Sequence, residues 1–134
     1  MQDEIKEVIK HYPKEAKLHF MQLRGLVVDQ AQKLDIQLHE TLKWGEPSYL
    51  CKNGSTIRIA WHKKTPHEIG VYFHCKSLLI EAIKELYPNT FICEGNRALL
   101  FQLNSTITVT DELAHCFSLA LLYHKIKHLP LLGV

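Results

Sequence analysis

The dipeptide Asn53-Gly54 constrains the fold of this chain more than any other feature, because it separates two runs of β-forming residues, YLCK and STIRIAWH. Asn-Gly tolerates the positive φ angles of a type I′ turn, which commonly joins two antiparallel strands. A two-residue turn also fixes the strand register, so we predict that Leu50 lies opposite Ile57 and Tyr49 opposite Arg58. A further strand, EIGVYFH at residues 68–74, follows the polar turn 63–66.

Side chains on successive strand residues point to opposite faces, which divides this predicted sheet into two sets of residues. The first set is apolar and is expected to face the core: Leu50, Ile57, Ile59, Trp61, Ile69, Val71 and Phe73. The second set is polar or aromatic: Tyr49, Cys51, Arg58, His62, Tyr72 and His74. Such a group could hold an anionic or aromatic ligand. Cross-strand Tyr and Arg pairs also stabilise exposed sheets, so both interpretations stay open.

Helical periodicity flanks the strands on both sides. A first helix is expected to end at Tyr12, since Pro13 disfavours the α conformation in the residue before it. A long second helix is expected to bury one stripe and to contain Gly25, which could mark close packing. The stripe consists of Ala16, Phe20, Leu23, Val27, Ala31 and Leu34.

The second half of the chain repeats the alternation of helix and strand. Ser77 is placed to cap a short helix that Pro88 ends, and a second hairpin turns around residues 94–96. Thr110 is expected to cap the last helix, whose inner stripe is Leu113, Phe117, Ala120, Leu121 and His124. The order of elements predicts a single α+β domain over residues 1–134, with one antiparallel sheet and the N- and C-terminal helices packed on one face.

Composition limits the classes of function. The net charge of +2 lacks the cationic bias of a dedicated nucleic-acid binder, so we expect no nucleic-acid partner. The start, MQDEIKEVIKHYPKE, is unlike a secretory signal, and no stretch is apolar for long enough to cross a bilayer. We therefore expect a cytoplasmic protein without a membrane partner. The four cysteines are widely spaced and are expected to be buried free thiols: Cys51, Cys75, Cys93 and Cys116.

The stretch LKWGEPSYL, residues 42–50, joins the helical part of the chain to its strands. Apolar residues at even positions from 36 to 44, interrupted once by Glu40, predict a strand, although a helix capped by Gly45 also fits. Pro47 cannot donate to a sheet ladder, so it is expected to end one strand and begin another. Trp44 would then anchor the corner in the core. The alternative is a pocket lined by Trp44 and Tyr49.

The same stretch resembles the YdhG-like family, also called the domain of unknown function DUF1801, through Trp44, Pro47 and Tyr49. The segments HKKTPHEIGVYF and EGNRALLFQL are also similar to that family, and the resemblance covers roughly residues 14–126. It implies a helix-flanked antiparallel sheet of the frataxin-like kind. It also implies a role in handling iron, because some members are described as frataxin-like iron chaperones.

Residues that could bind metal or carry out catalysis are scattered along the chain. His124 and His128 are four apart, a spacing at which two imidazoles on one helix could ligate zinc or iron, although basic residues also favour a helix C-terminus. His62, His67 and His74 could approach one another at one hairpin end. The sequence has no G-x-S-x-G, Walker or G-x-G-x-x-G motif, so hydrolase and nucleotide-binding templates lack local support.

These observations favour a small non-enzymatic binding protein that uses its open sheet face for a protein partner or a small ligand. The candidate ligand-binding residues are Trp44, Pro47, Tyr49, Arg58, Tyr72 and His74. One alternative is a small-molecule-binding or enzymatic domain with a site near Trp44, Tyr49, Arg58 and Tyr72. Another is an interaction module that dimerises through its sheet.

Overall fold

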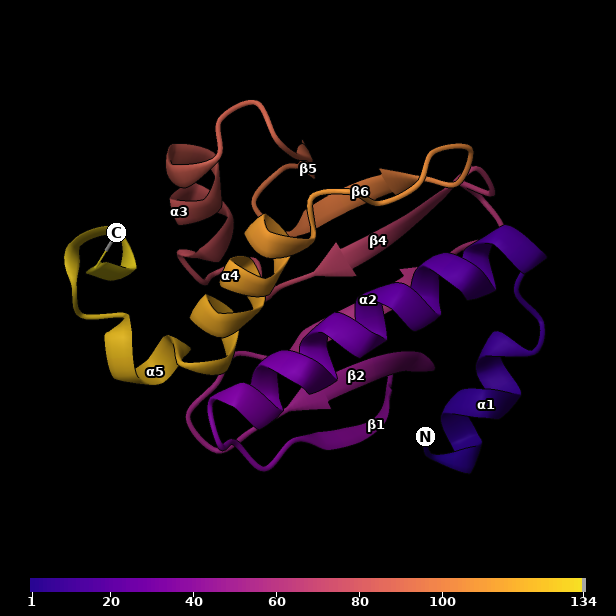
Figure 1. The fold of residues 1–134 in the computed structure, drawn as a ribbon, viewed down its shortest axis with the longest axis horizontal. Coiled ribbons are helices and arrows are strands. Elements are labelled where there is room, and N and C mark those ends of the chain that lie inside the picture. Colours follow the sequence, from indigo (N-terminus) through magenta and orange to yellow (C-terminus); the bar gives the residue numbers. More distant parts are fainter. Residues whose placement is uncertain (134) are drawn as a thin grey trace.

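A computed structural model describes residues 1–133 and contains one antiparallel sheet in the order β1-β2-β3-β4-β6-β5 (Figure 1). Each strand is antiparallel to its neighbours. The strands are β1 (His39–Lys43), β2 (Glu46–Leu50), β3 (Ile57–Trp61), β4 (Glu68–Tyr72), β5 (Ile92–Glu94) and β6 (Ala98–Gln102). The predicted α+β class with a single antiparallel sheet is confirmed.

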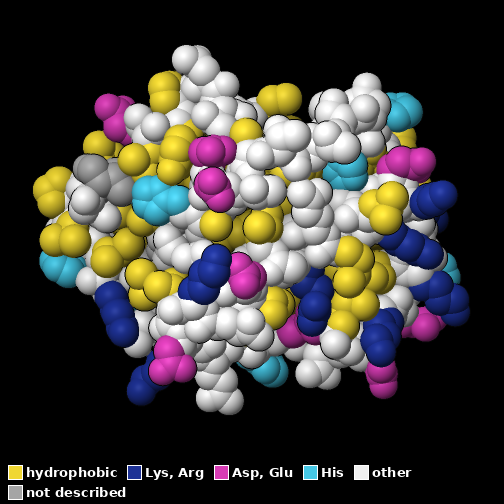
Figure 2. All heavy atoms as spheres, viewed as in Figure 1, with side chains coloured by type: hydrophobic (Ala, Val, Ile, Leu, Met, Phe, Trp, Pro, Cys, Tyr) yellow, Lys and Arg dark blue, Asp and Glu magenta, His cyan; other side chains and the backbone are white. Residues whose placement is uncertain are grey.

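The helices lie before, between and after the strands in the sequence. They are α1 (Asp3–Ile9), α2 (Lys14–Lys33), α3 (Leu79–Leu86), α4 (Thr110–Leu121) and α5 (Tyr123–Ile126), followed by the 3-10 segment η1 (Pro130–Gly133). Helices α2 and α4 cross in front of the strands on the same side of the sheet (Figure 1). On this side, Lys and Arg alternate with Asp and Glu over the lower half of the surface (Figure 2). The opposite face of the sheet carries the candidate functional site.

The core is the layer between α2, α4 and one face of the sheet. Five residues of the predicted α2 stripe are buried, namely Ala16, Phe20, Leu23, Val27 and Ala31. His19 is also buried in α2 and contacts two backbone carbonyl oxygens, that of Glu15 through Nδ1 at 2.9 Å and that of Ser105 through Nε2 at 2.8 Å. Gly25 is exposed, and a Cβ added to it would have no neighbour within 4 Å, so the prediction of close packing there is wrong.

The turn predicted at Asn53-Gly54 is wrong. Neither residue has a positive φ, and six residues separate the end of β2 from the start of β3. Tertiary hydrogen bonds hold this loop instead, because Ser55 N–H donates to Ala120 O at 2.8 Å and His124 N–H donates to Asn53 O at 2.9 Å. Contacts with α4 and α5 therefore outweigh the local preference of Asn-Gly.

The two-residue hairpin lies earlier, at Trp44-Gly45, where both residues have positive φ (57° and 75°). These residues join β1 to β2, and Lys43 pairs directly with Glu46. The prediction of a strand is thus confirmed, and the helical alternative for this segment is wrong. The prediction that Trp44 anchors the core is also wrong, because a turn residue projects beyond the sheet and the side chain is 90% exposed.

The register between β2 and β3 differs from the predicted one by one residue. Tyr49 pairs with Ile57, and Ser48 pairs with Arg58. Tyr49 therefore lies fully buried on the core face. Leu50, which was predicted to face the core, lies on the opposite face. A shift of one residue must have this effect because side chains alternate along a strand. The assignments for β3 and β4 are confirmed, with Ile57, Ile59, Ile69 and Val71 buried in the core.

Pro47 is buried as the second residue of β2, inside the strand instead of between two strands. The β2–β3 ladder pairs only two residues of each strand, and Pro47 lies just outside it. Because Pro47 has no N–H to donate, the ladder is short at this point.

Helix ends differ from the predictions in three places. Helix α1 ends at Ile9, three residues before Tyr12, and Thr110 is the first residue of α4 without a capping side-chain hydrogen bond. The last helix is interrupted at Leu122, so α5 is a separate short helix. His124 is consequently exposed and does not continue the buried stripe of α4.

The four cysteines are free thiols with different environments. Cys116 is buried, and burial raises the pKa of its thiol to about 12. Cys51 and Cys93 are half-buried, whereas Cys75 is exposed. The prediction of four buried thiols is therefore wrong for Cys75, which follows the end of β4 in a loop. Across residues 1–133, no helix is long and apolar enough to cross a bilayer.

Candidate functional site

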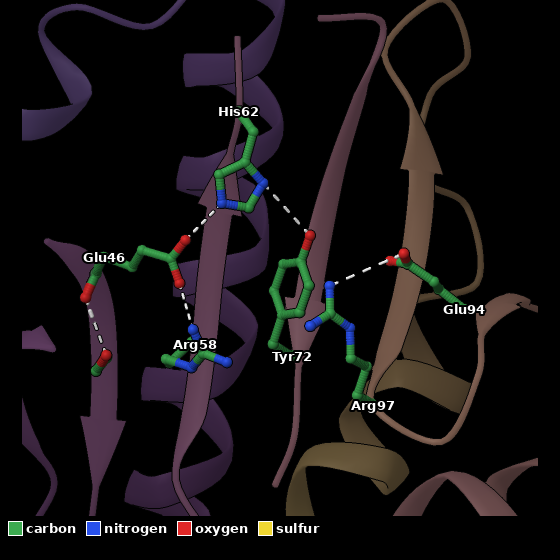
Figure 3. Close-up of polar contacts among 7 residues, drawn as sticks. Glu46, Arg58, His62, Tyr72, Glu94 and Arg97 are labelled. Carbon is green, nitrogen blue, oxygen red and sulfur yellow. Dashed lines mark hydrogen bonds and ion pairs between the residues drawn. The ribbon is translucent and has the colours of Figure 1, made fainter. Parts of the chain in front are cut away.

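The face of the sheet opposite α2 and α4 carries a group of charged and aromatic side chains that we call the sheet-face cluster. Figure 3 shows its members, which come from β2, β3 and the residue after it, β4, β5 and the turn before β6: Glu46, Arg58, His62, Tyr72, Glu94 and Arg97. Strand pairing brings them together, since Arg58 lies opposite Tyr72, and Tyr72 lies opposite Ala98, the residue after Arg97.

Tyr72 is at the centre of the cluster. The guanidinium carbon of Arg58 is 5.4 Å from the centre of its ring, and that of Arg97 is 5.5 Å away. Both distances are within the range of cation–π attraction. These neighbours leave Tyr72 only 6% exposed, although α2 and α4 lie on the opposite face of the sheet.

Small residues beneath the Tyr72 ring allow it to lie flat on the sheet. A Cβ added to Gly70 would be 2.6 Å from Tyr72 Cε2, so only glycine leaves room for the ring at this position. Ala60, which pairs with Gly70, and Ala98 are buried with Tyr72 in a small cluster of their own. In the sequence Gly70-Val71-Tyr72, the glycine has no side chain, and the ring of Tyr72 occupies the space that a side chain would fill.

Glu46 links two other members of the cluster. One carboxylate oxygen accepts a hydrogen bond from Arg58 Nη1, and the other lies 2.5 Å from His62 Nε2. On the other side of the imidazole, Nδ1 of His62 is 3.5 Å from the hydroxyl oxygen of Tyr72 (Figure 3). The side chain of Glu46 is only 18% exposed, so this ion pair is screened less than a fully exposed one.

The electrostatic surroundings keep Tyr72 protonated. Burial raises the pKa of its hydroxyl, the negative charge of Glu94 raises it further, and the positive charge of Arg97 opposes them. The net pKa is above the ordinary value of 10.0, so the phenol is neutral at physiological pH.

The structure divides the predicted ligand-binding residues among five places. Arg58 and Tyr72 are adjacent in the sheet-face cluster, whereas Tyr49 is buried on the other face of the sheet. Trp44 is exposed at the β1–β2 turn, Pro47 is buried in β2, and His74 is exposed beyond the end of β4. These residues do not line one common pocket, and the site near Trp44, Tyr49, Arg58 and Tyr72 is not assembled.

Tyr49 takes part in a hydrogen-bond network on the core side. Its hydroxyl donates to Glu40 Oε2 at 2.7 Å, and Arg24 Nε donates to the same oxygen at 2.6 Å. The other oxygen of Glu40 accepts the Gln2 N–H at 2.9 Å. Glu40, which interrupts the apolar alternation of β1, is thus a structural residue that joins α1, α2, β1 and β2.

The sequence did not point to Glu46 or Arg97 as members of a site. Glu46 precedes a proline, which marks a turn or strand start without indicating a charge partner. Arg97 reaches Tyr72 only because β6 pairs with β4, and sequence periodicity does not specify which strands become neighbours. In the sequence, the feature that could have indicated a role for Arg97 was its position immediately before an apolar strand.

The donor groups do not fit a metal site. Among residues 1–133, no group of three or more His, Cys, Asp or Glu side chains could hold a metal ion. His124 and His128 do not share one continuous helix, because α5 ends at Ile126. The iron role implied by the family resemblance therefore stays a prediction without a donor set in the described part of the chain.

No protein-family model matches the sequence, and no curated protein and no solved structure matches the chain. The resemblance to the YdhG-like family therefore stays a prediction.

Proposed function

We propose that this chain is a non-enzymatic binding protein and that the sheet-face cluster, together with Trp44, forms its contact surface for a partner protein. The observation that carries the proposal is the position of Tyr72 between Arg58 and Arg97 on the face of the sheet opposite α2 and α4. Arginine, tyrosine and tryptophan are the residue types that contribute most of the binding energy in protein interfaces.

The arrangement of the cluster favours binding because its side chains are already held in place. Glu46 fixes both Arg58 and His62, and Tyr72 is held by Gly70 below it and by the two arginines. Side chains that are ordered before association lose less conformational entropy when a partner binds.

Catalysis is less consistent with the same geometry. Glu46, His62 and Tyr72 follow the order carboxylate, imidazole, hydroxyl, which in hydrolases activates a nucleophile. Here Arg58 neutralises the carboxylate, and the raised pKa of Tyr72 opposes formation of a phenolate. The hydroxyl oxygen of Tyr72 is also 3.5 Å from His62 Nδ1, at the outer limit of a hydrogen bond, and Tyr72 is only 6% exposed to a substrate.

Trp44 gives independent support for a contact surface. It is 90% exposed and has a positive φ, which is unfavourable for a residue with a bulky side chain. No packing within residues 1–133 compensates for placing tryptophan there, since it is among the exposed large hydrophobic residues. A local cost without a structural gain is typical of functional positions.

Arg97 indicates the chemistry of the partner. Its side chain is 54% exposed, and its contact with Glu94 is a long one, 3.8 Å between Nη2 and Oε1. An exposed pair of this kind contributes little, so the guanidinium is available for a carboxylate of the partner. We therefore propose a partner that offers acidic side chains next to an apolar contact for Trp44.

The test compares the double variant Trp44→Ser/Arg97→Glu with a matched control on the helical side, Leu18→Ser/Lys33→Glu. Leu18 is exposed on α2, and Lys33 forms an exposed ion pair with Asp29. Proteins captured from lysate by the wild-type chain are identified and purified, and their dissociation constants are measured by calorimetry with each variant.

The proposal predicts a partner whose affinity falls by about tenfold or more with the sheet-face variant, as expected when interface anchors are removed, and is unchanged with the control. Equal affinity for both variants would contradict it. Sedimentation velocity identifies the case in which the partner is a second copy of the chain.

A further inference from the structure

A cavity of about 390 Å³ lies at the end of the sheet where the β2–β3 loop, the segment between β4 and α3, and helix α5 meet (Figure 1). No member of the sheet-face cluster lines it. Its volume is within the range of sites that bind small molecules. The cavity is therefore separate from the proposed contact surface for a partner protein.

Hydrogen bonds between its three walls hold the cavity in shape. Ser55 N–H donates to Ala120 O at 2.8 Å, and His124 N–H donates to Asn53 O at 2.9 Å, which fixes the β2–β3 loop against α4 and α5. Leu78 N–H donates to the hydroxyl oxygen of Tyr123 at 3.0 Å, which fixes the start of α3 against α5. The walls are therefore joined before any ligand enters.

The walls carry basic side chains from two separate segments. Lys76 and His74 come from the β4–α3 segment, and His124 and Lys127 come from α5 and its end. Among the described residues that line the cavity, none carries a carboxylate. No ion pair within residues 1–133 uses either lysine. The positive charges are thus free to meet an anion from outside the chain.

Neutral donors add to this charge. Ser55 and Thr56 line the cavity and each carries a hydroxyl, whereas the hydroxyl of Ser77 already donates to His74 O at 2.7 Å. The backbone N–H of Lys76 donates to Nδ1 of His74 at 3.1 Å, so the neutral imidazole of His74 carries its proton on Nε2. His74 can therefore act as a donor whether or not it is charged.

We propose that this cavity binds the phosphate group of a small phosphorylated molecule. A phosphate monoester has close to two negative charges near neutral pH and three strong acceptor oxygens. Two lysines and several hydroxyl and imidazole donors match that charge and that number of acceptors. The volume leaves room for the organic part of the ligand beside its phosphate.

The test is a titration of the ¹⁵N-labelled chain with inorganic phosphate and with glycerol 3-phosphate, each at constant ionic strength. We expect saturable shifts confined to the amides of residues 54–56, 74–77 and 123–127. Glycerol 3-phosphate is expected to bind at least as tightly as phosphate. If phosphate binds and the ester does not, the site takes a free ion and the proposed ligand class is wrong.

The double variant Lys76→Ala/Lys127→Ala is expected to weaken binding by about tenfold or more, because it removes both fixed charges of the site. The matched control is Lys63→Ala/Lys64→Ala, which removes the same charge from an exposed turn that does not line the cavity. All four lysines are exposed, so both variants are expected to keep the wild-type spectrum outside the changed positions. Equal weakening by both variants, or equal shifts with sulfate in place of phosphate, would overturn the proposal.

Discussion

Glu40 shows how a single residue can contradict a sequence pattern and still stabilise the fold. Burial alone would raise the pKa of its carboxyl, but hydrogen bonds from Arg24, Gln2 and Tyr49 outweigh burial and lower the pKa below the ordinary value of 4.5. The sequence shows only an acid at one of the alternating, otherwise apolar positions from 36 to 44. Its partners come from three other parts of the chain, so the local pattern could not predict the network.

The lowered pKa of Glu40 predicts a pH-dependent contribution to stability. The ionised carboxylate stabilises the folded state at pH values above 4.5, and this contribution is lost as pH falls through the lowered folded-state pKa. We expect Glu40→Gln to reduce the free energy of unfolding by about 1–3 kcal/mol at pH 7, because it weakens several bonds to a buried acceptor. The difference from the wild type should shrink on acidification, as measured by urea unfolding across the pH range.

The control for this measurement is Glu7→Gln, which removes an exposed carboxylate paired with Lys10. Exposed pairs on a helix contribute little, so we expect Glu7→Gln to change the free energy of unfolding by less than about 0.5 kcal/mol at both pH 3 and pH 7. A cost for Glu40→Gln that is the same at pH 3 and pH 7 would contradict the assigned network.

At the scale of elements, periodicity predicted the amphipathic helix α2 and the strands β3 and β4, because each buries one regular set of side chains against the core. Turns were predicted less well. Two dipeptides ending in glycine compete for the two-residue hairpin, and Asn53-Gly54 has the stronger local preference. The loop that contains Asn53-Gly54 is hydrogen-bonded to α4 and α5, so tertiary packing decides its conformation. The two-residue hairpin forms at Trp44-Gly45 instead.

The packing of that loop gives a prediction at the same scale. A Cβ added to Gly54 would be 2.4 Å from Cys51 Sγ and 2.9 Å from Leu121 O, so Gly54→Ala must displace the loop from α4. We expect a loss of about 1–3 kcal/mol in the free energy of unfolding, as for other overpacked positions.

Gly25→Ala is the matched control, because Gly25 is exposed in the middle of α2 with nothing within 4 Å of an added Cβ. It is expected to stabilise the chain by about 0.5–1 kcal/mol through helix propensity. Urea unfolding of both variants checks the opposite signs. A destabilisation of similar size at both positions would show that the loop does not pack against α4 as described.

At the scale of the whole molecule, the sequence predicted the α+β class, the single antiparallel sheet and the position of Arg58 and Tyr72 on the face away from the helices. It did not predict that Arg97 completes the stack on Tyr72, because the pairing of β6 with β4 joins distant segments. The basic cavity was missed for the same reason, since its residues come from three segments that meet only in the folded chain.

The proposed contact surface depends on the strand register that places Tyr49 in the core and leaves Arg58 beside Tyr72 on the face away from the helices. The most direct test is a nuclear Overhauser experiment on the labelled chain, which detects protons of directly opposed strand residues. We expect cross-strand contacts between Ser48 and Arg58, between Tyr49 and Ile57, and between Arg58 and Tyr72. Contacts between Tyr49 and Arg58 and between Leu50 and Ile57 would contradict this register and the surface built on it.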